Sequence, residues 1–121
     1  MSVLKFRAWD KRFNNMVYGS PMAILYLNNS DHEIMQGTGL LDKSGKEIYE
    51  GDILKPYSIE ASKLEVFWFD QYSRFSLRHY PQWLEEKNDN SLNSVSNIGD
   101  ESHTKYCEII GNIYENPELL K

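Results

Sequence analysis

The feature that most constrains the fold of this chain is the stretch of residues 35–54, in which two turns separate three short apolar runs. Asp42 and Gly45 stand at the first and fourth positions of a four-residue turn, where type I turns favour these two residue types. Glycine also adopts the positive φ that a hairpin with a bulge requires, so Gly45 is predicted to close a β-hairpin. A second break, at residues 50–52, is followed by another apolar run. Strands this short, joined by turns this tight, predict a small β-barrel.

Short runs of alternating apolar and polar residues continue this pattern in the rest of the chain. Such alternation predicts strands with one face covered and the other in water. In the first run, Phe6 and Ala8 share the apolar face, and Arg7 lies on the polar one. The predicted strands cover residues 3–9, 16–18, 34–36, 64–69, 74–80 and 105–114. The fold class predicted from this pattern is mainly β.

Helix is predicted only in two short pieces, near residues 81–87 and 116–120. Each piece has a proline in its first turn, where the missing N–H group costs no hydrogen bond. Residues 24–27 are a compact apolar run that is interpreted with the strands.

Eight apolar residues are predicted to be largely buried. They are Phe6, Ile48, Ile53, Val66, Trp68, Phe75, Leu77 and Ile113.

The composition of the 121-residue chain limits its function classes. Its length fits one domain, and its net charge of −5, with no basic run longer than Lys11-Arg12, argues against a nonspecific nucleic-acid binder. The single cysteine, Cys107, rules out an internal disulfide and fits a reducing cytoplasm. There is no apolar leader and no apolar run of the ~20 residues that span a bilayer. The sequence therefore predicts a cytoplasmic protein that does not enter the membrane.

The residues that most often carry out chemistry are scattered. His32, His79 and His103 are far apart, and none has a second metal ligand at the spacing of a zinc site. Cys107 lies four residues after His103, which on a strand places the two side chains ~13 Å apart. No catalytic residue, metal ligand or cofactor site is therefore predicted, and Cys107 is interpreted as a small core residue.

One acidic group stands close to a tight turn. Glu47, Glu50 and Asp52 could bind a divalent cation or carry out acid–base chemistry. The favoured interpretation is that Asp52 caps the turn through backbone amides, while Glu47 and Glu50 are solvated.

Two kinds of binding surface remain open. An acidic stretch between residues 85 and 103 is the candidate surface for a protein partner, and its residues are Glu85, Glu86, Asp89, Asp100 and Glu101. The alternative is a small barrel that binds nucleic acid, with aromatic residues such as Trp9, Trp68 and Trp83 stacking on bases. The net negative charge makes the nucleic-acid alternative the less favoured one.

Four blocks of sequence together resemble the YopX family of bacteriophage and prophage proteins. Their order and spacing match the family from near the first residue to near the last. The blocks are Phe6 to Asp10, Met35 to Leu40 without Gly37, Asp42 to Ile53, and Ile110 to Leu119. Gly37 and Leu41 depart from the family pattern, and residues 55–104 follow no motif.

The resemblance implies an N-terminal β-hairpin region at residues 1–34 and an SH3-like barrel at residues 35–121. It also implies a phage or prophage accessory protein in the cytoplasm of a bacterial host, of uncharacterised biochemical activity. No catalytic residue can be carried over from the family. We therefore expect a non-enzymatic protein that binds a host or phage protein, with homo-oligomerisation left open.

Overall fold

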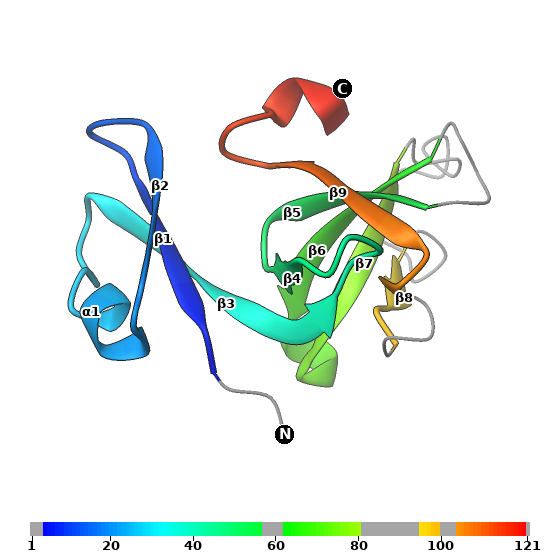
Figure 1. Cartoon of the computed structure of the whole chain (residues 1–121), viewed down its shortest axis with the longest axis horizontal. Coiled ribbons are helices and arrows are strands. Elements are labelled where there is room, and N and C mark those ends of the chain that lie inside the picture. The colour runs from blue at the N-terminus through cyan, green and yellow to red at the C-terminus, as the bar shows by residue number, and fades with distance from the viewer. Residues whose placement is uncertain (1–3, 57–61, 81–94, 100–103, 121) are drawn as a thin grey trace.

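The computed structural model of the chain describes residues 4–56, 62–80, 95–99 and 104–120. Its strands form two antiparallel sheets, one of four strands and one of five. The first strands of the four-stranded sheet lie at one end of the molecule, and the five-stranded sheet lies at the other (Figure 1). The prediction of a mainly β fold is therefore confirmed.

The first sheet has the strand order β2-β1-β3-β4. Its strands are β1 (Phe6–Asp10), β2 (Asn15–Gly19), β3 (His32–Leu41) and β4 (Glu47–Tyr49). β1 pairs along its whole length with β2 on one side and with β3 on the other. It is consequently the strand best held in this sheet.

A short helix, α1 (Pro21–Leu25), packs on this sheet, where only an apolar run was expected. The Ser20 side chain caps it by accepting a hydrogen bond of 3.2 Å from the backbone amide of Ala23, and Pro21 occupies its first turn. Ile24 is buried against Gly19, where there is no side chain to obstruct it. The prediction that helix occurs only near 81–87 and 116–120 is therefore wrong. The serine–proline pair is an N-terminal helix signal that outweighed the strand-like composition.

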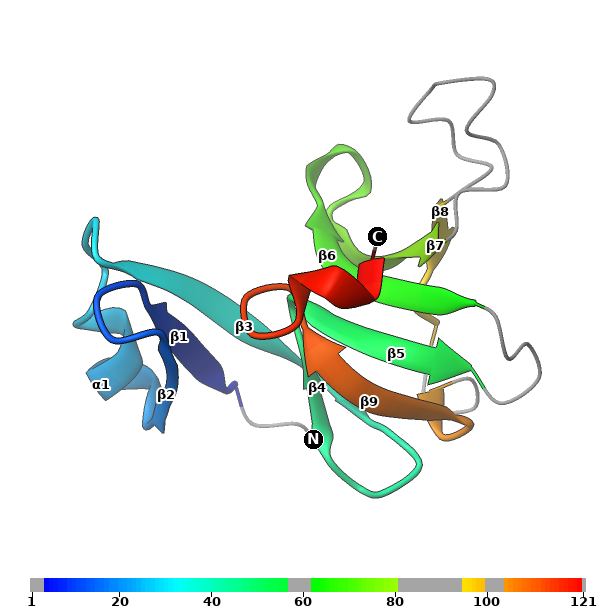
Figure 2. The same cartoon turned by 90° about the horizontal axis from the view of Figure 1, so that it is seen from above.

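The second sheet has the strand order β8-β7-β6-β5-β9 and curls into a half-barrel (Figure 2). Its strands are β5 (Asp52–Pro56), β6 (Lys63–Phe69), β7 (Arg74–Tyr80), β8 (Val95–Asn97) and β9 (Cys107–Asn112). A 3-10 turn at Asp70–Tyr72 joins β6 to β7, and another at Pro117–Leu120 follows β9. The second turn confirms the helical piece predicted near 116–120. The piece predicted at 81–87 lies outside the described residues. No helix in the described part of the chain has the length and apolar character needed to cross a membrane.

One strand, β3, belongs to both ends of the molecule. Residues 32–36 pair with β1, and residues 37–41 pair with β4 across an irregularity between Gly37 and Leu41. In Figure 1, β3 runs from β1 and β2 to the half-barrel. We call the part of the first sheet formed by β1, β2 and residues 32–36 the N-terminal sheet. The boundary predicted between residues 34 and 35 falls inside this strand. The division into a β-hairpin region and a barrel that together form one compact unit stays a prediction.

The turn predicted around Gly45 is confirmed. Gly45 has a φ of +84° and donates a backbone hydrogen bond of 3.0 Å to the carbonyl of Asp42, between β3 and β4. The Asp42 carboxylate accepts hydrogen bonds from the amides of Ser44 and Lys46, and its second oxygen accepts one from the amide of Ile109. One aspartate therefore holds the turn and also attaches it to β9.

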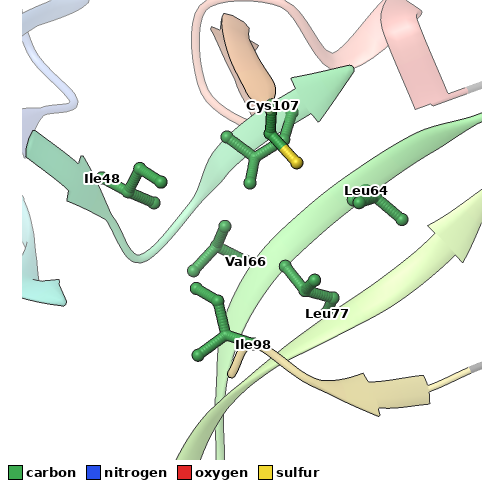
Figure 3. Packing of buried hydrophobic residues seen from close by; sticks show 7 residues of the cluster. Ile48, Leu64, Val66, Leu77, Ile98 and Cys107 are labelled. Atoms are coloured by element: carbon green, nitrogen blue, oxygen red, sulfur yellow. The ribbon is translucent and has the colours of Figure 1, made fainter. Parts of the chain in front are cut away.

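The main core lies inside the curled second sheet (Figure 3). Its buried members are Ile48, Leu54, Leu64, Val66, Leu77, Ile98 and Cys107. Of the predicted core, Ile48, Ile53, Val66 and Leu77 are buried, and Phe6, Phe75 and Ile113 are half-buried. The prediction is wrong for Trp68, which is 42% exposed. Trp68 lies at the end of β6, past the enclosed part of the sheet, and contacts Phe75 edge to face at 5.0 Å.

Candidate functional site

The junction between the two sheets is built around a buried ion pair. Arg7 of β1 donates a hydrogen bond of 2.9 Å to the carboxylate of Asp52 at the start of β5. Their side chains are only 4% and 3% exposed. The same guanidinium also donates to the backbone carbonyl of Glu50 at 3.1 Å. This arrangement fixes the N-terminal sheet on the half-barrel.

Aromatic rings complete the junction. The Arg7 guanidinium lies over the ring of Tyr49, 4.7 Å from its centre, and Tyr18 meets Tyr49 edge to face at 6.0 Å. Trp9 stacks on Tyr114, which follows β9, at 5.7 Å. Alternation places Arg7 and Trp9 on the face of β1 opposite Ala8. The prediction that this was the solvent face is wrong, because the half-barrel covers it.

The three carboxylates next to the turn at residues 50–52 all hold backbone groups. Asp52 accepts a hydrogen bond of 2.8 Å from the amide of Tyr49, so its predicted role as a turn cap is confirmed. Glu47 accepts one of 2.8 Å from Gly39, and Glu50 accepts one of 3.0 Å from Gln36. Both glutamates are half-buried, so the prediction that they are solvated is wrong.

Burial governs the ionisation of two of these groups. It raises the pKa of Asp52 above its ordinary value, although Arg7 and the Tyr49 amide act in the opposite direction. Burial also raises the pKa of Glu50, opposed by the Gln36 amide and by Arg7. Because both carboxylates are occupied by contacts within the chain, they serve to hold the junction together.

A cleft of about 410 Å³ opens beside the ion pair. The loop at residues 112–116 forms one wall of the cleft. In this loop the Asn112 side chain accepts hydrogen bonds from the amides of Tyr114 and Glu115. It also donates one of 2.7 Å to the Glu115 carboxylate. Among the described residues, the lining contains no serine, threonine, cysteine or histidine. The lining includes Arg7, Tyr18, Lys46, Glu47, Tyr49 and Asn116.

Two of the three histidines, His32 and His79, lie within hydrogen-bond distance of neutral side chains. Nδ1 of His32 lies 2.8 Å from the side-chain oxygen of Asn29, and Nε2 of His79 lies 2.9 Å from the Ser96 hydroxyl. His32 also lies 3.6 Å from the Asp10 carboxylate. His103 lies outside the described residues. In the part of the chain that the structure describes, no three or more His, Cys, Asp or Glu residues group as a metal site would require.

Cys107 is buried in the main core, as the sequence predicts, and burial raises the pKa of its thiol. All five acidic residues predicted to contact a partner lie outside the described residues. They are Glu85, Glu86, Asp89, Asp100 and Glu101.

An exposed apolar surface on α1 was not predicted. Met22, Leu25 and Tyr26 are 82%, 48% and 89% exposed, and their spacing places them on one side of the helix. Ile24 points to the sheet instead. In Figure 1, α1 lies at the end of the molecule away from the half-barrel. We call Met22, Leu25 and Tyr26 the α1 surface. A helix over 21–25, recognised from Ser20 and Pro21, would have revealed it.

Comparison with known proteins places the fold. Residues 24–121 match a family model described as YopX protein. The crystal structure of protein EF1440 from Enterococcus faecalis is 27% identical, with a TM-score of 0.64, and the match covers 100% of both chains. The structure of protein yopX from Bacillus subtilis is 23% identical, with a TM-score of 0.56, and the match covers 100% of this chain and 98% of that one. No curated protein matches this chain.

Proposed function

Because this chain belongs to the YopX family, we propose that it is an accessory protein of a phage or prophage that works in the cytoplasm of the bacterial host. It acts by binding a host or phage protein and carries out no chemistry of its own. The partner contacts the α1 surface.

The observation that carries this proposal is the exposure of three large side chains, two on the five-residue helix α1 and one, Tyr26, at its C-cap. Apolar surface in contact with water is unfavourable by roughly 25 cal/mol per Å² relative to buried surface. Met22 and Tyr26 are almost fully exposed, and the helix carries no charged side chain. Methionine and tyrosine are enriched at protein interfaces, where charged residues are depleted. A partner that covers the α1 surface would therefore gain affinity without first removing water from a charge.

The junction supports the non-catalytic part of the proposal. A general base must be within hydrogen-bond reach of its substrate and free to take up a proton. Asp52 is instead buried between Arg7 and the Tyr49 amide, and Glu50 is bound to the Gln36 amide. Of the two, Asp52 lines the nearby cleft, and its carboxylate already has partners there.

Site-specific cross-linking tests the protein partner. A photo-reactive phenylalanine analogue is placed at position 26 in the full chain, which is then expressed in host cells. We expect a cross-linked partner at position 26 that is lost in Met22→Asp. The matched control is the same analogue at position 106, because Tyr106 is also exposed but lies in the half-barrel next to β9. Equal cross-linking at both positions, or none at 26, would remove the α1 surface from the proposal.

Purified protein tests the absence of chemistry. We expect no turnover of nuclease or phosphatase substrates. Turnover that disappears in a folded Asp52→Asn variant, and that persists in a variant of Asp31, whose side chain is 50% exposed, would overturn the non-enzymatic part of the proposal.

A further inference from the structure

A second surface with a different composition belongs to the hairpin of β6 and β7, whose backbone is seen in Figure 2. The register pairs Phe67 with Ser76 and Phe69 with Arg74, and paired residues of an antiparallel ladder share a face. The opposite face carries Val66 and Leu77 into the core. Phe67, Phe69, Arg74 and Arg78 therefore lie on the other face of the hairpin, together with Lys63, Glu65 and Ser76. Trp68 and Phe75 are paired on the core face instead. We call this surface the β6–β7 face, and its members are Lys63, Phe67, Phe69, Tyr72, Arg74 and Arg78.

Three rings on this face are in contact one after another. Phe67 and Phe69 have centres 5.5 Å apart, and Phe69 meets Tyr72 edge to face at 5.0 Å. A guanidinium group lies at each end of this row. Arg78 lies over Phe67 at 4.2 Å, and Arg74 lies over Tyr72 at 4.7 Å. The result is a continuous aromatic row with a positive charge at both ends.

The charge of this face is opposite in sign to that of the whole chain, which is −5. Arg78 is close to the Glu65 carboxylate, at 3.4 Å, but Arg74 has only the Ser76 hydroxyl, at 3.2 Å from its Nε. Neither Arg74 nor Lys63 forms an ion pair with any described residue. The hairpin carries three cationic side chains and two carboxylates, which are those of Glu65 and of Asp70 in the turn. A small positive excess remains.

We propose that the β6–β7 face binds single-stranded nucleic acid, with bases stacking on Phe69 and Tyr72 and the phosphates meeting Arg74. Proteins that hold single strands combine aromatic side chains with a positive surface that follows the backbone. Every base has a ring face, so a row of three rings suits a polymer of bases. An acidic protein segment is the less favoured occupant, because protein anchors fill well-packed pockets. Tyr72 of the β6–β7 face is 40% exposed and its other members are half-buried. None of them lines the cleft of the junction. This inference is independent of the proposed protein partner.

Fluorescence anisotropy with a labelled oligomer of about 15 thymidines tests the inference. We expect Tyr72→Ala to weaken binding about fivefold or more, the loss of one stacked base, and Tyr72→Phe to retain it. The chain supplies a matched control, because Arg12 lies over the exposed ring of Phe13 at 5.3 Å in the loop between β1 and β2. Phe13→Ala is expected to leave the affinity unchanged. Thermal unfolding of each variant confirms that it is folded.

Salt dependence gives a second readout. If Lys63, Arg74 and Arg78 all contact phosphates, the slope of log affinity against log salt is about −2 for a single strand. Arg74→Gln should make that slope shallower by about 0.7, and Arg12→Gln, which removes the same charge elsewhere, should not change it. Absence of binding at about 50 mM salt, or equal losses in the Phe13 and Arg12 controls, would overturn the inference. Displacement of the oligonucleotide by poly-glutamate at lower concentration than by unlabelled thymidine oligomer would also overturn it, in favour of an acidic protein segment.

Discussion

Arg7 and Asp52 are 45 positions apart in the chain, yet their charged groups meet at 2.9 Å in the interior. This pair joins the N-terminal sheet to the half-barrel. Both charges are buried, so the lost hydration of each is compensated by its interaction with the other. The pair is therefore better understood as fixing the relative position of the two sheets than as a source of stability.

Breaking this pair is expected to be costly. Asp52→Ala leaves the Arg7 charge buried and unpaired, which should lower the free energy of unfolding by ~3–5 kcal/mol. The double variant Arg7→Met, Asp52→Leu should recover most of that loss, because it removes both charges and also the Arg7 Nε, which has no hydrogen-bond partner among the described residues. Urea unfolding measures both effects.

The control for that experiment is the exposed pair of Lys11 and Glu33, which has the same distance of 2.9 Å. Lys11→Met is expected to change stability by less than about 1 kcal/mol, because water compensates exposed charges. A double variant at Arg7 and Asp52 that is no more stable than Asp52→Ala would contradict the interpretation of the buried pair.

Asp42 is expected to make stability depend on pH. Burial acts to raise the pKa of Asp42, but hydrogen bonds from the amides of Ile109, Lys46 and Ser44 together hold it below the ordinary value of 3.8. A carboxyl group whose pKa is lowered by folding stabilises the protein above its ordinary pKa. That stability is lost as the pH falls through the lowered, folded-state value.

The variant Asp42→Asn tests this dependence. It keeps one acceptor oxygen but cannot accept the bond from Ile109 as well, so it should be less stable than wild type near neutral pH. The difference should stay constant down to about pH 5 and shrink as the pH falls through the ordinary pKa of 3.8 and below, because the carboxyl group of the unfolded chain is protonated first. Urea unfolding at several pH values measures it, and a difference that stays constant below that pKa as well would refute the assignment.

Gly45→Val should destabilise the protein by ~1–2 kcal/mol, the cost of a branched side chain at a positive φ. A Cβ atom at Gly45 would have nothing within 4 Å, so the cost comes from the backbone alone. Gly51→Val should cost more, because a Cβ atom there would also lie 3.2 Å from the Met35 sulfur. Thermal unfolding ranks the two. Because the two glycines have nearly the same φ, a cost at Gly51 no larger than that at Gly45 would show that the contact with Met35 adds nothing.

Leu54→Ala and Trp68→Ala separate the core from the rim of the second sheet. Leu54 is fully buried, and its truncation should cost ~2–5 kcal/mol. Trp68 is the larger residue but is partly exposed, so its truncation should cost less than that of Leu54. If thermal unfolding shows a larger loss for Trp68, its contact with Phe75 carries more of the stability than its burial indicates.

The parts of the fold that depend on local chemistry could be predicted from the sequence. The turn at Gly45 needs only an aspartate and a glycine at fixed spacing, and alternation is visible in β6 and β7. Burial of Arg7 could not be predicted, because alternation separates two faces of a strand without showing that a distant sheet covers the polar one. The prediction that Trp68 is buried is wrong for a related reason, since alternation does not show where the enclosed part of the sheet ends.

The two candidate surfaces were harder to predict from the sequence than the burial of single residues. The α1 surface depends on a five-residue helix, too short for a clear periodic pattern. The β6–β7 face depends on strand register, which brings Arg74 beside Phe69 and Arg78 near Phe67. The sequence does show the aromatic and basic residues, but the net charge of the whole chain concealed their local excess.

The pairing of β3 also shows that the family model matches less of the chain than the fold requires. The family match begins at residue 24, inside α1, and so leaves out β1 and β2. A chain trimmed to that region would keep residues 32–36 with an unpaired edge, which invites association with other chains. It would also lack the guanidinium that compensates Asp52. The segment matched by the family model is therefore not a self-sufficient piece of this molecule, and a chain made for expression should begin before β1.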